Sequence, residues 1–314
     1  MGKESNYFAG LGRRIMQHWQ IYLLLVPMVI ILIVFSYRPM GGLVIAFQRF
    51  SPFLGTQGST FVGWDNFENL LFGRASAMFW RAVRNTFILG FYRLTIGFAF
   101  PIILAILYHE LKMSKFRSFT QSVLLLPNFL SDVIVAGIVI AFLQPTTGVV
   151  NHFLLNIGLI DEGIYFLMRP EYFRGIFTFV GIWMQAGLYS LIYLAALSSI
   201  SRELYESASL DGCSRLKRIW HVSLPGIRPT IVVLFIIAVG DILTNSFFER
   251  VLLLYQPVTY ETADVIGSFV FRMGIAQQDF SIAAAAGLLN SVIALIMVLV
   301  ANFLSRKYSE SSLF

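Results

Sequence analysis

Charged side chains are scarce in this sequence. Asp, Glu, Lys and Arg make up 13% of its 314 residues and hydrophobic residues 57%, whereas a soluble domain has about 25% charged residues. This composition excludes an ordinary soluble domain and predicts an integral membrane protein. The net charge of +6 would favour a nucleic-acid partner in a soluble protein. In a membrane protein it indicates topology and contact with anionic lipid, so we expect no nucleic-acid partner.

Cysteine is almost absent as well. The single cysteine, Cys213, excludes an internal disulfide and any metal site built from several cysteines. We expect it to be a free thiol on a small residue packed in a loop. The sequence also lacks the His-Glu-x-x-His pattern of zinc proteases and the Gly-x-x-x-x-Gly-Lys-Ser/Thr loop that binds nucleotide phosphates. It therefore predicts no metal site, no cofactor and no ATPase activity within this chain.

Long apolar segments are the main feature that is present. A helix needs about 20 apolar residues to cross the hydrocarbon core of a bilayer. Six segments approach or exceed this length, namely 20–37, 86–107, 119–142, 173–200, 230–254 and 280–303. They predict an all-α protein with six transmembrane helices. Because no internal repeat or low-complexity tract is evident, we expect one membrane domain over residues 1–314, with its six-helix core at 20–303.

Basic residues indicate the orientation of this domain. Thirteen of the 23 Lys and Arg residues lie in four short segments, 1–19, 108–118, 201–228 and 304–314. Because Lys and Arg are enriched on the cytoplasmic side of membrane proteins, we expect these four segments to be cytoplasmic. Both chain termini are then predicted to lie inside the cell.

The two long outer segments, 38–85 and 143–172, are predicted to contain ordered structure. The first holds several aromatic residues and the sequence Gly63-Trp64-Asp65-Asn66-Phe67. The second begins with Pro145-Thr146-Thr147-Gly148, a turn signal, and continues with an apolar stretch from Val149 that predicts a short interfacial helix. Either segment could receive a partner from outside the cell, or simply pack at the lipid interface.

The cytoplasmic segment 201–228 combines charge with helix signals. Ser201 is a suitable N-cap for a short helix that continues to Leu210. Asp211-Gly212 then offers a turn, because glycine adopts a positive φ at little cost. A second, basic helix is predicted from Arg215, and Leu224-Pro225 is expected to end it. On composition alone this segment could be a solvated loop between two membrane helices.

The spacing within this segment is more specific than its composition. Its residues follow the pattern E-A-A-x3-G-x9-I-x-L-P, with Ser207, Cys213 and Val222 as small-for-small departures. This pattern resembles the cytoplasmic coupling loop of permeases in binding-protein-dependent ATP-binding-cassette (ABC) importers. The resemblance implies that a separate ATPase contacts the residues at the motif positions, namely Glu206, Ser207, Ala208, Asp211, Gly212, Leu224 and Pro225.

The resemblance extends over nearly the full chain. Residues 183–200 resemble the helix that leads into the coupling loop of carbohydrate permeases, and Gly63–Phe67 resembles their outer-loop motif. Residues 247–257 and 261–266 resemble permeases for complex polysaccharides, including those of the alginate importer. The resemblance implies a type I importer fold in the bacterial cytoplasmic membrane. It also implies a second homologous permease, two ATPase subunits that use ATP and Mg, an extracytoplasmic solute-binding protein and a saccharide substrate.

Ionisable residues inside the predicted spans mark places that must be paired or hydrated. Arg93, Asp132 and Asp241 lie within spans, and Arg250 lies near the end of the fifth. One interpretation is that Arg93 pairs with Asp132 or Asp241 and locks helices together. The other is a hydrated sugar path, in which tyrosine rings stack on sugar faces and arginines attract a carboxylated sugar such as an alginate fragment.

We predict the residues of this sugar path on two grounds: their register with the pattern of the maltose permease, which the chain resembles, and the chemistry of their side chains. Register gives Gly181, Gln185, Leu188, Gly240, Asp241 and Thr244. Chemistry adds Arg93, Tyr189, Asn245 and Arg250. The two glycines would leave room for a bulky ligand.

Three other functions were weighed against the importer permease. An intramembrane aspartyl protease would use Asp132 and Asp241, but Ala238 stands where its motif needs glycine. A secondary transporter that works alone should show inverted repeats and broken helices, and neither is evident in the sequence. A permease for another solute class, such as amino acids or phosphate, is the remaining alternative.

Overall fold

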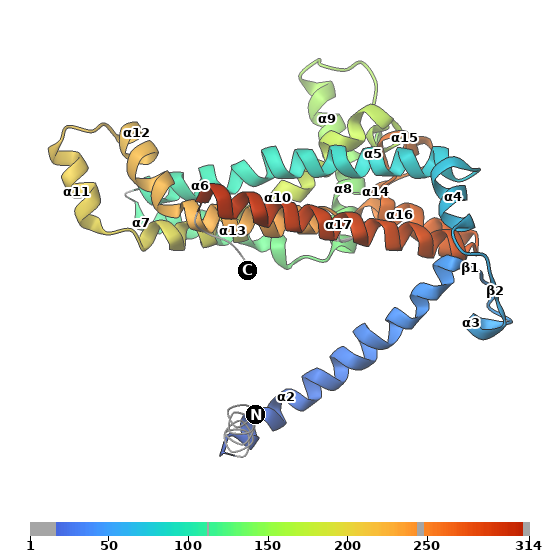
Figure 1. Ribbon diagram of the computed structural model, residues 1–314. Coiled ribbons are helices and arrows are strands. Elements are labelled where there is room, and N and C mark those ends of the chain that lie inside the picture. The colour runs from blue at the N-terminus through green and yellow to red at the C-terminus, as the bar shows by residue number, and fades with distance from the viewer. Residues whose placement is uncertain (1–16, 112, 244–247, 310–314) are drawn as a thin grey trace, which may run out of the picture.

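The computed structural model describes residues 17–111, 113–243 and 248–309. Within these ranges, five helices are long and apolar enough to cross a membrane, and a bent helix pair makes six if it counts as one span. The long helices α5, α6, α10, α13 and α17 run along one another, and the shorter elements gather at the two ends of the bundle (Figure 1). The predicted all-α membrane architecture is therefore confirmed.

The first long helix extends away from the bundle (Figure 1). It runs from Trp19 to Phe47 as α2 (Trp19–Leu32), the π-helical η1 (Ile33–Tyr37) and the 3₁₀-helical η2 (Arg38–Phe47). None of its most apolar window is buried, and only η2 packs against the rest of the chain. The predicted span 20–37 was too short, because Pro39 lies in the first turn of η2, where proline is tolerated.

A small sheet and a short helix follow at the outer end of the bundle. Strand β1 (Gln48–Arg49) pairs antiparallel with β2 (Thr60–Phe61) around α3 (Gly55–Gly58), and α4 (Asp65–Phe72) comes next. Asn66 binds this region together, since its side-chain amide donates 2.9 Å hydrogen bonds to the carbonyls of Ala46 and Gln48. The Gly63–Phe67 sequence therefore ties the end of η2 and the strand β1 to the start of α4.

The second long helix runs from Ser76 to Glu110. It consists of α5 (Ser76–Tyr92), a π-helical turn η3 (Arg93–Gly97) and α6 (Phe98–Glu110). The predicted span 86–107 lay inside it and was too short at its start. The π-helical turn begins at Arg93, the ionisable residue that the sequence singled out, and such turns are frequent at functional sites.

The third predicted span, 119–142, is not one helix. The structure has α7 (Ser114–Leu125) with η4 (Leu126–Phe129), then α8 (Asp132–Leu143), and the two parts meet at 104°. Leu130 is extended, and the Ser131 side chain accepts a 3.4 Å hydrogen bond from the Ile134 amide as the N-cap of a new helix. The expectation that no helix is broken was therefore wrong.

Residues 144–169 form the predicted ordered outer segment. The turn at Pro145–Gly148 leads into α9 (Val149–Asn156), which confirms the short helix, and η5 (Phe166–Met168) follows. The buried Asn151 side chain donates to the carbonyls of Leu143, Gln144 and Ile164. One side-chain amide therefore connects the two ends of this segment.

Helix α10 (Pro170–Ser198) is the centre of the bundle and packs against α6, α7 and α13. It confirms the predicted span 173–200. Its buried residues Phe173, Phe177, Val180 and Met184 recur with helical spacing and join one core cluster.

The fifth predicted span, 230–254, began too late in the chain. The long helix begins at Arg215 and, counted to Ile242, has 28 residues, of which those from Leu224 belong to α13 (Leu224–Leu243). Helix α14 (Phe248–Leu254) follows residues 244–247, which lie outside the described ranges. After it come η7 (Pro257–Thr259), α15 (Tyr260–Ala263), α16 (Ile266–Phe271) and η8 (Arg272–Ala276). The last helix, α17 (Phe280–Ser309), confirms the span predicted at 280–303.

Buried charges fix the outer end of the bundle. Asp264 is fully buried and accepts hydrogen bonds from Arg272 at 2.6 and 2.9 Å and from the Ser268 hydroxyl at 2.8 Å. Arg81 lies 3.7 Å from the same carboxylate. Because a buried carboxylate is tolerated only when it is paired, this cluster holds α5 against α16 and η8.

Candidate functional site

The segment predicted to couple to an ATPase forms a short helix and a well-defined turn at one end of the bundle (Figure 1). Helix α11 (Arg202–Leu210) begins at Ser201, whose side chain accepts a 3.3 Å hydrogen bond from the Glu203 amide. At its end the Cys213 amide donates to the Ala208 carbonyl and the Gly212 amide to that of Ser209. This is a Schellman motif, and Gly212 adopts the φ of +72° that it requires. The cap and the glycine turn are both as predicted.

The second helix of this segment does not end where the sequence predicted. Ser214 caps α12 (Arg215–Arg218), which passes through the π-helical η6 (Ile219–Ser223) directly into α13. Leu224-Pro225 was expected to end the helix, but the wider turn of η6 just before it lets the helix continue. The second helix of this segment and the fifth span are therefore one continuous helix of 28 residues, from Arg215 to Ile242.

Polar contacts hold the two helices of the segment together. The Tyr205 hydroxyl lies 3.0 Å from that of Ser223, and Arg218 donates a 2.9 Å hydrogen bond to the Ser209 hydroxyl. The Tyr205 ring also lies 5.5 Å from that of His109, at the end of α6. These contacts join α11 to α6 and, through Ser223 of η6, to the long helix that contains α13.

The solvent-exposed surface of this segment contains both apolar and charged side chains. Leu204, Leu210, Leu216 and Trp220 are exposed, and exposed Glu206 pairs with Arg202 at 3.3 Å. Of the remaining predicted coupling residues, Ser207, Asp211, Gly212 and Pro225 are exposed, while Ala208 and Leu224 are half-buried. Exposed apolar residues beside charges are suited to docking another protein.

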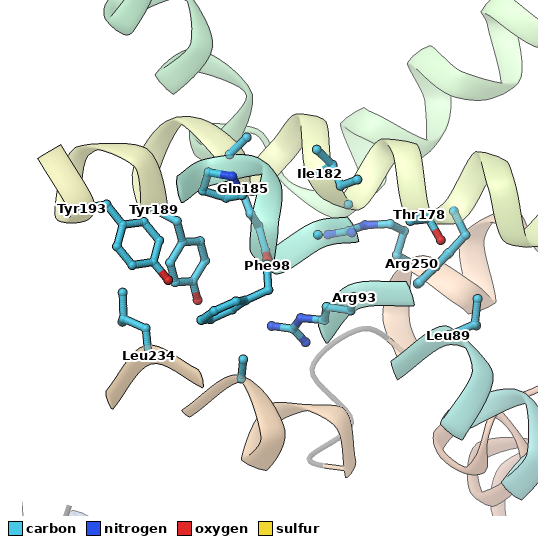
Figure 2. Close-up of a pocket in the computed structure, with 16 residues that line it drawn as sticks. Leu89, Arg93, Phe98, Thr178, Ile182, Gln185, Tyr189, Tyr193, Leu234 and Arg250 are labelled. Carbon is cyan, nitrogen blue, oxygen red and sulfur yellow. The ribbon is translucent and has the colours of Figure 1, made fainter. Parts of the chain in front are cut away.

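A cavity lies within the bundle, between α10 and the helices η3, α6, α13 and α14 (Figure 2). Five predicted path residues line it, namely Arg93, Gly181, Gln185, Tyr189 and Arg250. Figure 2 shows Arg93 and Arg250 reaching into the same space, with the rings of Tyr189, Tyr193 and Phe98 farther along α10 and α6. The cavity thus joins guanidinium groups to aromatic rings, a combination that can bind carboxylates and stack on sugar faces.

Both arginines in the cavity are paired with carboxylates. Arg93 donates from Nη2 to Asp241 Oδ2 at 3.1 Å, joining η3 to α13. Arg250 donates from Nε to Asp132 Oδ1 at 2.7 Å, joining α14 to α8. The two interpretations of Arg93 are therefore compatible, since it both links helices and lines the cavity. The aspartyl protease alternative loses its basis, because Asp132 and Asp241 face different arginines.

The remaining predicted path residues either do not line this cavity or lie outside the residues that the structure describes. Leu188 and Gly240 are not among the residues that line this cavity. A Cβ on Gly240 would lie 3.2 Å from Val298, so this glycine lets α13 pack closely against α17. Thr244 and Asn245 lie outside the described residues.

Several lining residues were missed by the sequence reasoning. They include Phe98, Pro101, Phe177, Thr178 and Leu234. All are apolar or weakly polar residues within long apolar spans, and such residues look alike whether they face lipid or a cavity. Phe98 and Pro101 lie on α6, which packs closely against α10, and this packing places them at the cavity.

Comparisons with known proteins agree with this geometry. A family model described as binding-protein-dependent transport system inner membrane component matches residues 69–310. The chain is 36% identical over 301 residues to the polygalacturonan/rhamnogalacturonan transport system permease protein YteP of Bacillus subtilis (strain 168), covering 96% of this chain and 92% of that protein.

Two solved structures are also similar. One is the crystal structure of a bacterial ABC transporter involved in the import of the acidic polysaccharide alginate, with 43% identity, a TM-score of 0.86, and coverage of 95% of this chain and 99% of that one. The other is the bacterial alginate ABC transporter in complex with an alginate pentasaccharide-bound periplasmic protein, with 42% identity, a TM-score of 0.87, and coverage of 96% and 99%.

These likenesses confirm the resemblance to importer permeases, which are transport components. The type I permease fold agrees with them. The chain belongs to the family of binding-protein-dependent transport system inner membrane components, and it is a multi-pass permease subunit of an ABC importer in the inner membrane.

Proposed function

We propose that this permease forms half of the membrane path of an ATP-driven importer for acidic oligosaccharides. The observation that carries the proposal is the cavity in which Arg93 and Arg250 face the same space as Tyr189 and Tyr193. Guanidinium groups bind carboxylates through paired N–H donors, and tyrosine rings offer flat apolar faces to sugar rings. A uronate unit has both a carboxylate, which the arginines can bind, and a sugar ring, on which the tyrosines can stack.

The similar proteins support the same substrate class. YteP is named for polygalacturonan and rhamnogalacturonan, and the similar solved transporter imports the acidic polysaccharide alginate. We therefore favour acidic oligosaccharides over amino acids or phosphate as the cargo.

The proposed importer needs several partners. A second permease would supply the other half of the path, and a solute-binding protein would deliver the oligosaccharide from outside. Two ATPase subunits, using ATP and Mg, would dock on the segment 206–225, which includes Glu206, Asp211 and Gly212. The continuous helix from Arg215 to Ile242 would carry their movement to Asp241, and through its ion pair to Arg93.

The test is uptake of an acidic oligosaccharide into proteoliposomes that contain the complete importer and its binding protein. We expect Arg250→Gln to lower kcat/KM about 10- to 100-fold, because a hydrogen bond to a charged group is worth about 1.5–3 kcal/mol. Arg74→Gln is the matched control, since Arg74 is exposed at the outer end of the bundle. Wild-type rates for Arg250→Gln in a correctly assembled importer would contradict the proposal.

A further inference from the structure

The guanidinium of Arg250 is held on two sides and bordered by a glycine on a third. Asp132 accepts its Nε–H at 2.7 Å, and the guanidinium carbon lies 5.9 Å from the centre of the Phe177 ring. On the third side is Gly181, where an added Cβ would lie 3.4 Å from Nη1. The Arg250 side chain is only 7% exposed, yet it lines the cavity. Its orientation is therefore fixed by its surroundings.

Asp132 is itself firmly placed. It is the first residue of α8, directly after the bend at Leu130 and the capping residue Ser131. The positive end of the helix dipole favours a carboxylate there. Helices α8 and α14 pack through Val135 and Val139 on one side and Val251 and Leu254 on the other. The bend that the sequence did not predict is thus what brings Asp132 to Arg250.

The nitrogen through which an arginine binds its aspartate determines which N–H donors remain for a ligand. Arginine presents five N–H donors in a planar fork, and the two Nη groups at its end can bind both oxygens of a carboxylate. Asp132 takes the Nε–H, so the end of the fork remains directed past Gly181 at the cavity wall. In the other pair Asp241 sits on Nη2 of Arg93, at the end of that fork. The two ion pairs are therefore not equivalent.

We propose that Asp132 is a positioning residue that sets the preference for acidic sugars. By holding Nε, it keeps the Nη end of Arg250 in the one orientation that can bind a carboxylate entering the cavity, and Gly181 leaves that end uncovered. Without Asp132, the long arginine side chain regains its rotamers and loses its prealignment. This inference rests on the proposed function, because it presupposes that the cavity receives uronates.

The experiment measures direct binding to the importer without its binding protein, so that the selectivity of the binding protein does not contribute. The complete permease–ATPase complex is placed in lipid nanodiscs. The dissociation constant is measured by calorimetry for a uronate tetrasaccharide and for the same tetrasaccharide with its carboxyl groups reduced to alcohols. The ratio of the two constants is compared among wild type, Asp132→Ala, Asp132→Asn and Asp65→Ala. Asp65 is an exposed aspartate that also opens a helix, α4.

We expect wild type and Asp65→Ala to prefer the acidic sugar about tenfold or more. Asp132→Ala is expected to reduce this ratio toward one by weakening binding of the acidic sugar alone. Asp132→Asn should keep the wild-type ratio or exceed it, because its amide oxygen still accepts the Nε–H while a competing negative charge is removed. A purely structural ion pair would instead give equal losses for both sugars and no rescue by asparagine.

The outcomes separate the two proposals. If wild type shows no preference for the acidic sugar, the proposed function fails and the role of Asp132 falls with it. If wild type has the preference and Asp132→Ala retains it, only the role of Asp132 is overturned. If Asp132→Ala does not assemble, Asp132→Asn decides alone, since a loss of acid preference in that variant would overturn the inference.

Discussion

At Gly187, a missing side chain sets the distance between two helices. A Cβ at this position of α10 would lie 2.1 Å from the Leu124 carbonyl oxygen and 2.5 Å from its carbon. Both atoms belong to the backbone of α7, so no rotamer change can relieve the overlap. Gly175, on the same helix, has open space where its Cβ would be. Gly187 therefore allows α7 and α10 to approach closely, whereas Gly175 serves no such close approach.

Substituting each glycine by alanine tests this difference. Alanine favours a helix by about 1 kcal/mol over glycine, so Gly175→Ala should leave the melting temperature unchanged or raise it slightly. Gly187→Ala must push α7 away from α10, and we expect it to lower the melting temperature by several degrees, consistent with an overpacking cost of about 1–3 kcal/mol. Thermal unfolding in detergent, followed by tryptophan fluorescence, measures both. Equal melting temperatures would show that α7 and α10 are not in close contact.

The role of a single residue could be predicted where its chemistry was unusual for its surroundings. It could not be predicted where the role depends on a partner that is distant in the sequence. Arg93 and Arg250 stood out as charges near apolar spans, and both line the cavity. The pairing of Arg250 with Asp132 joins residues 118 positions apart, and nothing in either local sequence records it. Gly240 is predicted to leave room for a ligand, and the structure adds that its lack of a Cβ lets α13 approach Val298 closely.

At the scale of elements, the coupling segment was predicted well because its signals are local. The Ser201 cap, the turn at Gly212 and the Ser214 cap each lie within a few residues of the group they satisfy. The continuation through Pro225 was missed because proline normally ends a helix, and only the π-helical turn η6 accommodates it. The 104° bend was missed because the apolar stretches directly before and after it, 123–126 and 133–140, look like one continuous span in the sequence.

Gly212 offers a test of the coupling turn. A Cβ there would meet no atom within 4 Å, so Gly212→Ala acts only through its positive φ, at a cost of about 1–2 kcal/mol. We expect this variant to loosen the end of α11 and to lower the ATPase recovered with the permease, and its transport-coupled ATP hydrolysis, by roughly fivefold. Gly212→Asn is the control, since asparagine tolerates this conformation. Equal losses in both variants would point to a requirement for glycine other than its backbone geometry.

At the scale of the whole molecule, the orientation in the membrane can be read from the only cysteine. Helices α11 and α12 lie at one end of the bundle, and β1, β2 and α4 lie at the other (Figure 1). The distribution of basic residues predicts that the first end is cytoplasmic. Cys213 lies between α11 and α12 and is partly exposed, whereas exposed Gln57 lies in α3 at the opposite end.

A membrane-impermeant maleimide should therefore label Cys213 in inside-out vesicles and leave it unlabelled in intact spheroplasts. In a Cys213→Ser, Gln57→Cys variant the result should be reversed. Labelling is measured by the mass shift of the purified chain. Labelling of Cys213 from the outside would show that the predicted orientation is inverted.

The two ion pairs of the cavity also have an electrical consequence. Arg93 with Asp241 and Arg250 with Asp132 sum to zero charge, so these four residues provide no net countercharge for an anionic cargo. An oligosaccharide with three carboxylates then carries its full charge into a cell that is negative inside, at about 2.3 kcal/mol per charge for each 100 mV, or about 7 kcal/mol in all. Import of such a polyanion without an accompanying cation would be electrogenic, and the membrane potential would oppose each turnover.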